Sequence, residues 1–224
     1  IGVNFTSAEL TMQLDDFAEL ILKPRVSQLA ASVDADVANA YKSIYNSVGT
    51  PGTTPATSLV LLQAQQKLNE FAAPMNPRYA TVNPAANAGL VEGMKGFFNP
   101  TGTISKQFAN GMMSTGVLGY DEINMSQSIA NHTTGSSATA PIVATTVSTQ
   151  GQSTLAISFT SGSPTFKKGD VFTIATVYAV NPQTRQSTGS LQQFVVTEDL
   201  SISSTTTGTL NISPAIYTAE HARS

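Results

Sequence analysis

Cysteine is absent from the sequence, and only two histidines occur among its 224 residues. Without cysteine the chain can form no disulfide, no thiolate metal site and no thiol nucleophile. His132 lies in a segment that reads His-Thr-Thr-Gly, and His221 lies among the last residues of the sequence. We expect both to be solvated surface side chains, and neither to serve as a general base or a metal ligand.

Charged side chains are also scarce. They make up 11% of the residues, against about 25% in typical soluble domains. A surface with so little charge is poorly protected against self-association, so we expect much of it to meet other protein. The net charge of -3 argues against nucleic-acid binding as the main role, and Lys167-Lys168 is typical of a turn.

The acidic residues form close pairs, a pattern that acid-base catalysis can use. We interpret them as solvated charge or helix-end electrostatics: Asp15-Asp16, Asp34 and Asp36, Asp121-Glu122, and Glu198-Asp199. Gly111 and Gly116 have the spacing of a phosphate loop, but Val117-Leu118 stand where that loop requires Lys and then Ser or Thr. We therefore expect no catalytic, cofactor-binding or metal-binding residue, no cofactor, and no enzymatic activity.

The longest periodic stretch, Asp15 to Val48, predicts one long helix. Its apolar residues recur every three or four positions and so share one stripe: Phe17, Leu20, Ile21, Val26, Leu29, Val33, Val37, Tyr41, Ile44 and Val48. Such a stripe requires a partner surface. Pro24 removes a backbone donor and crowds the preceding turn, so we expect a kink near Leu20 to Lys23 or a break into two helices.

The next part of the chain reads as a mixed α/β unit. The expected elements are a helix over residues 59–72, a strand over 79–82, helices over 88–98 and 104–111, and a strand with a turn over 116–129. Thr57 or Ser58 is the expected N-cap of the first helix, and Asn83-Pro84 ends the strand. Residues 3–14, ahead of the long helix, alternate as a half-buried strand does.

From Ser136 to Thr218 the chain has almost no charge and no helical period. Short β segments alternate with turns rich in Gly, Ser, Thr, Pro and Asn, which predicts a small antiparallel barrel or sandwich. The sequence contains no apolar run near eighteen residues, so we expect no membrane span.

Taken together, several segments resemble one protein family. Residues 3–55, 69–84 (NEFAAPMNPRYATVNP) and 96–135 are similar to the major capsid (coat) proteins of short-tailed bacteriophages that carry an inserted β-barrel. Residues 164–199, which include PTFKKGDVFTIATVYAVNP, look like that family's insertion domain. No single motif carries the resemblance; the order and spacing of the segments do.

The resemblance implies an α+β fold, the Hong Kong phage type of capsid fold. Residues 1–53 would form part of the peripheral domain, with residues 15–48 as its long spine helix. Residues 54–135 would form the axial domain, 136–218 the β-barrel insertion, and 219–224 the start of a return to the axial domain. We also expect the chain to be a truncated piece of a longer protein.

The resemblance further implies a structural subunit that assembles with copies of itself, as hexamers and pentamers, into an icosahedral procapsid and capsid that encloses DNA. Its partners would be scaffolding and portal proteins, with non-specific contact to packaged DNA and none with a membrane. It would reside in the virion, and in the host cytoplasm during assembly. Two alternatives stay open. One is a β-rich bacterial surface or adhesin module. The other is a hydrolase that uses a Ser or Asp whose partners the sequence does not reveal, and a cleft that joins His132 to a carboxylate within hydrogen-bond reach would favour it.

Overall fold

The computed structural model describes residues 18–50, 52–94, 110–111, 116–137, 139–147, 149–203 and 206–217. These residues combine helices with both parallel and antiparallel strands, which confirms the expected α+β class. They fall into two compact units: the residues up to Ala40 with Ser128–Ala130, and the remainder. The strand expected over 3–14, the helix start at 15–17 and most of the helix expected over 104–111 lie outside the described residues, as do 219–224.

The first unit contains the long helix. A π-helical turn, Ala18–Leu22, leads into α2, Lys23–Ala38, which carries Pro24 in its first turn, and a 3-10 turn over Asn39–Ser43 follows. A proline is tolerated there because the first-turn N–H groups have no partner within the helix. The irregular turn thus lies where Pro24 predicts a disruption.

The helix ends earlier than predicted, at Ser43 instead of Val48. The ring of Tyr45 packs edge-on against Phe71 with centroids 6.3 Å apart. The backbone of Ser47 forms hydrogen bonds with the side chain of Gln193, 146 residues away in the sequence. These tertiary contacts fix residues 44–48 in a non-helical path and override the local periodicity, which is a weak determinant of structure.

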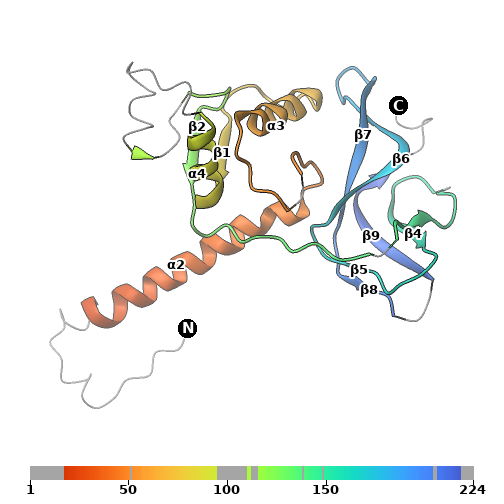
Figure 1. Cartoon of the computed structure of the whole chain (residues 1–224), viewed down its shortest axis with the longest axis horizontal. Coiled ribbons are helices and arrows are strands. Elements are labelled where there is room, and N and C mark those ends of the chain that lie inside the picture. Colours follow the sequence, from red (N-terminus) through yellow and green to blue (C-terminus); the bar gives the residue numbers. More distant parts are fainter. Residues whose placement is uncertain are drawn as a thin grey trace, which may run out of the picture. The chain divides into compact units, whose positions relative to one another are not determined.

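The second unit begins with a small α/β arrangement. Its elements are α3 (Ser58–Glu70), β1 (Tyr79–Val82), α4 (Pro84–Gly93) and β2 (Glu122–Met125). Strands β1 and β2 pair in parallel, from Tyr79 opposite Glu122 to Val82 opposite Met125, and α4 lies against them (Figure 1). A buried cluster joins the helices to β2: Leu61, Leu90, Met94, Tyr120 and Ile123.

Two helix starts show how local chemistry sets these elements. Thr57 is the N-cap of α3, as predicted, although its side chain makes no capping hydrogen bond. Helix α4 was expected to start at residue 88 but begins at Pro84, because Asn83 Oδ1 accepts a 2.8 Å hydrogen bond from the N–H of Ala86. Asn83-Pro84 therefore ends the strand and also starts the helix, as an N-cap followed by a first-turn proline.

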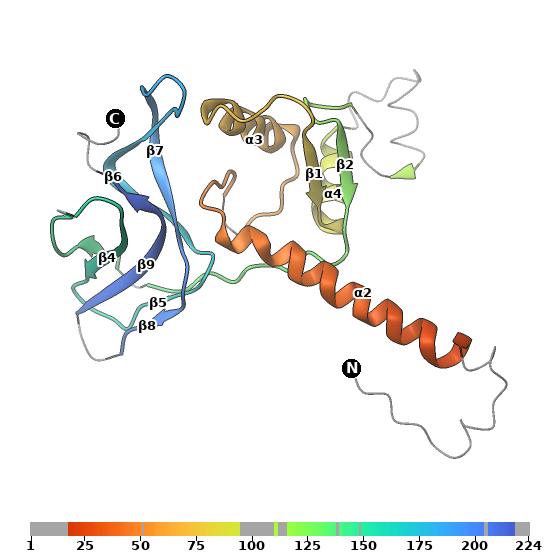
Figure 2. The same ribbon diagram turned by 180° about the vertical axis from the view of Figure 1, so that it is seen from behind.

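The later part of the second unit, residues 131–217, is called here the β region. Its main sheet has the order β3-β4-β9-β7-β6 and is antiparallel throughout. Figure 2 labels four of these strands, β4, β9, β7 and β6. The strands are β3 (Ile142–Val143), β4 (Gln152–Ser158), β6 (Val171–Val180), β7 (Ser187–Val196) and β9 (Thr207–Ile216), and the short strands β5 (Thr165–Phe166) and β8 (Leu200–Ser201) form a second pair. Its core consists of Leu155, Ile157, Phe194, Val196, Leu210 and Ile212.

Candidate functional site

Gln193 on β7 joins the β region to the chain that follows the long helix. Its Oε1 accepts a hydrogen bond from Ser47 N, and its Nε2 donates one to Ser47 O, both at 3.0 Å. Lys67 Nζ, from α3, donates to the same Oε1. The side-chain amide therefore pairs with the backbone of Ser47 as a neighbouring strand would. It satisfies both the backbone N–H and the backbone C=O of that residue.

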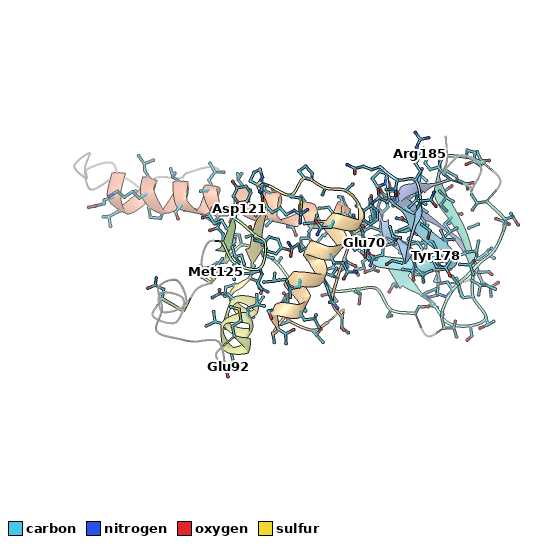
Figure 3. All side chains as sticks on the ribbon, turned by 90° about the horizontal axis from the view of Figure 1, so that it is seen from above. Glu70, Glu92, Asp121, Met125, Tyr178 and Arg185 are labelled. Carbon is cyan, nitrogen blue, oxygen red and sulfur yellow. The ribbon has the colours of Figure 1, made fainter. Side chains whose placement is uncertain are left out.

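Asn181, at the end of β6, makes the second polar connection to α3. Its Nδ2 donates a 2.7 Å hydrogen bond to Glu70 O, one of the carbonyls that a helix C-terminus leaves unpaired. Its Oδ1 accepts from the N–H groups of Gln183 and Thr184, which shapes the β6–β7 turn. Glu70 and Arg185, a residue of that turn, are labelled in Figure 3.

Aromatic side chains border the same junction. A hollow of about 450 Å³ is lined by residues that include Tyr45, Phe71, Tyr178 and Tyr217. Tyr178 and Tyr217 are 53% and 59% exposed. Burial lowers the pKa of Lys67 here, although Glu70 acts to raise it. The junction thus combines apolar contact with neutral amide hydrogen bonds.

Arg78 is the one buried cation that the described residues contain. Its guanidinium donates to Asn69 Oδ1 at 2.7 Å, Pro74 O at 2.8 Å and Ala73 O at 3.1 Å, so it caps the chain that leaves α3. The backbone N–H of Arg78 donates a 2.6 Å hydrogen bond to Asp121 Oδ2. A cation at a helix C-terminus also complements the helix dipole. Arg78 therefore has a structural role.

His132 was expected to be a solvated side chain, and this expectation is wrong. Its side chain is 17% exposed, and its Nε2 lies 2.8 Å from Asp170 Oδ1. Asp170 Oδ2 accepts from the N–H groups of Gly135, at 3.0 Å, and Lys167, at 2.8 Å. Both carboxylate oxygens are occupied by donors that fix the backbone. This is the histidine–carboxylate contact that the hydrolase alternative requires, on a carboxylate that lines a hollow of the β region. Among the described residues, His132 is not hydrogen-bonded to a serine or threonine hydroxyl, and the observed bonds of the pair fasten chain segments.

The other acidic pairs were expected to be solvated charge or helix-end electrostatics, but several of them accept hydrogen bonds from residues distant in the sequence. Asp121 binds the backbone of Arg78, Glu198 Oε2 accepts from Asn211 Nδ2 at 2.7 Å, and Asp199 Oδ1 accepts from Lys168 N at 2.7 Å. Lys167-Lys168 lies in a turn, as predicted. Asp34 and Asp36 are exposed on α2, whereas Asp15-Asp16, His221 and residues 112–115 of the glycine segment lie outside the described residues.

No local sequence pattern marks Gln193, Asn181 or Asp170 as a residue of these sites. Gln193, Asn181 and Asp170 lie 146, 111 and 38 residues from Ser47, Glu70 and His132. Over the part of the chain that the structure describes, no three His, Asp or Glu side chains are placed to hold a metal ion. In that same part, no helix is long and apolar enough to cross a membrane.

Comparison with known proteins identifies the family. The family model described as "P22 coat protein - gene protein 5" matches residues 2–223. A search of the curated proteins found no match. Because the family match covers nearly the whole chain, the chain belongs to the P22 coat protein family and is a structural coat protein of a bacteriophage capsid.

Proposed function

We propose that the chain is a subunit that assembles with copies of itself into an icosahedral shell around phage DNA, without catalysing a reaction. The observation that carries this proposal is the family match over residues 2–223. In the proposed fold, α2 belongs to the spine of a Hong Kong phage type of subunit. The α/β arrangement belongs to its axial domain, and the β region is an inserted barrel.

The surface of α2 supports a role in self-association. Val26, Leu29, Val33 and Val37 share one stripe and are 50–68% exposed. None of the residues of α2 is buried. A helix with an exposed apolar stripe gains free energy when that stripe is covered, at about 25 cal/mol per Å² of apolar surface removed from water. In the proposed shell, neighbouring subunits contribute to this cover.

The charge balance supports weak and non-specific contact with DNA. The sequence has 11 basic and 14 acidic residues, so a subunit offers little to neutralise phosphate. Scaffolding and portal proteins are the further partners that assembly of such a shell requires. Under the same proposal, the subunit resides in the virion, and in the host cytoplasm during assembly.

Electron microscopy of the full-length protein, expressed with its scaffolding protein, tests the proposal. Closed shells of uniform size are expected. A full-length chain that folds but stays monomeric under these conditions contradicts it.

A further inference from the structure

Residues 132–137, called here the strap, lie against the short strand β5. Thr165 N donates to Ser136 O at 2.9 Å, and Ser136 N donates to Thr165 Oγ1 at 3.1 Å. Gly135 fits closely, since a Cβ atom at this position would lie 2.0 Å from Thr165 O. Real Cβ atoms do not approach a carbonyl oxygen so closely. The strap is therefore seated on β5 through contacts that depend on glycine.

The carboxylate of Asp170 fastens the strap to the turn between β5 and β6. Oδ1 meets Nε2 of His132, and because a carboxylate can only accept, that nitrogen carries the proton of the bond. Oδ2 accepts from Gly135 N on the strap and from Lys167 N on the turn. Asp170 is 15% exposed, so these charge-assisted bonds are shielded from water. One side chain thus holds the strap at two points.

The strap forms part of the wall of a hollow in the β region, called here the cavity, which is partly open to solvent. The cavity has a volume of about 600 Å³. Most of its lining is apolar, from core residues that include Leu155, Phe172 and Val196, and the strap contributes residues 134–137. Its lining also includes residues of β3 and β6, the two edge strands, so the sheet curls around this space. A volume of this size is typical of small-molecule pockets.

The sheet itself does not depend on the Asp170 side chain. Gly169 N donates to Val196 O, and Val196 N donates to Asp170 O, both at 2.9 Å and both between backbone groups. The β4–β9 and β6–β7 ladders are likewise formed by backbone groups. Loss of the carboxylate therefore removes the fastener of the strap and leaves the ladders in place.

We propose that residues 132–137 are a strap that forms one wall of this apolar cavity, and that the Asp170 carboxylate is the fastener whose loss widens access to the cavity for small uncharged apolar molecules. Local opening of this kind is possible where one segment is held by a few hydrogen bonds, most of them to side chains, while the surrounding ladders are extensive.

Hydrogen exchange of Asp170→Ala, read at the amides of Gly135 and Ser136, tests the fastener. Exchange at both amides is expected to become about tenfold faster or more, while the amides of β4 and β9 keep their protection. Asp199→Ala is the matched control: it removes one carboxylate from a neighbouring turn, where it binds Lys168 N and not the strap. It should leave Gly135 and Ser136 unchanged.

Access to the cavity is measured in the same variants with N-phenyl-1-naphthylamine, an uncharged probe that fluoresces in apolar surroundings. A several-fold gain is expected in Asp170→Ala and in Gly135→Ala, whose new Cβ displaces the strap without touching the carboxylate, but not in Asp199→Ala. If Asp170→Ala does not fold, His132→Ala replaces it, with a smaller gain in exchange and fluorescence. Unchanged exchange at Gly135 and Ser136, an equal rise throughout β4 and β9, or no gain in fluorescence each overturns the proposal.

Discussion

The side-chain amide of Gln193 and the backbone of Ser47 form a reciprocal pair of hydrogen bonds, each 3.0 Å long, across 146 residues of sequence. The Gln193 side chain forms the two backbone hydrogen bonds that a neighbouring strand would otherwise form with Ser47. The pair holds the chain after the long helix in an irregular path that its own periodicity does not favour. Neutral amides of this kind connect the β region to α3 and to the segment before it.

Replacing Gln193 by leucine removes this pairing. Ser47 N and O and the Lys67 ammonium then lose a partner, so we expect a loss of about 1–3 kcal/mol in the free energy of unfolding. Urea denaturation followed by circular dichroism measures the change. Gln183→Leu, at an exposed turn position, should change stability by less than about 0.5 kcal/mol. Equal effects of the two substitutions contradict the role assigned to Gln193.

Replacing Arg78 by methionine leaves three acceptors at the C-terminal end of α3 without their donor. We expect a loss of roughly 3–5 kcal/mol, because buried polar groups that lose a charged partner are costly. Lysine at this position keeps the charge but has no planar fork, so it should recover only part of the loss. Arg25→Met on the exposed surface of α2 is the control, and thermal unfolding ranks the variants.

Gly93 and Gly89 both lie on α4, where alanine is intrinsically favoured over glycine by about 1 kcal/mol. A Cβ at Gly93 would lie 2.2 Å from Ala56 O, whereas one at Gly89 would lie 3.0 Å from Pro55 O. We expect Gly93→Ala to destabilise the protein clearly and Gly89→Ala to be milder. The midpoints of denaturation decide the order, and a stabilising Gly93→Ala rules out the close approach.

Tyr120 makes the fold sensitive to alkaline pH. Burial raises the pKa of its hydroxyl above the ordinary 10.0, with an opposing effect of Arg78, and the hydroxyl donates to Leu61 O at 3.1 Å. Above pH 10 the unfolded chain ionises at this residue more readily than the folded one, so stability present at neutral pH is lost as pH rises.

Tyr120→Phe should therefore cost about 1 kcal/mol at pH 8, through the lost hydrogen bond, and lose less further stability than the wild type between pH 9 and pH 11. Denaturation at each pH supplies the comparison. Tyr79→Phe, at a position 64% exposed, provides the control. A wild type and a Tyr120→Phe variant that lose stability in parallel show that the tyrosine does not titrate as described.

Local pattern predicted those elements whose signals lie within a few residues. The strand Tyr79–Val82, the N-cap at Thr57 and the long antiparallel strands of the β region all follow from period and turn chemistry. The failures arise where distant residues decide. The helix stops at Ser43 because of contacts to Gln193 and Phe71, and His132 is covered because Asp170 meets it. No window of local sequence contains those partners.

Counting shells in electron micrographs of the full-length protein, expressed with its scaffolding protein, decides whether the chain packs against copies of itself. Val33→Glu places a charge on the exposed apolar stripe of α2, and Gln28→Glu places the same charge on the opposite face of that helix. Abundant shells are expected for the wild type and Gln28→Glu, and few or none for a folded Val33→Glu. Equal shell numbers for all three would rule out the stripe of α2 as an assembly surface, and no shells for any of them would rule out self-assembly.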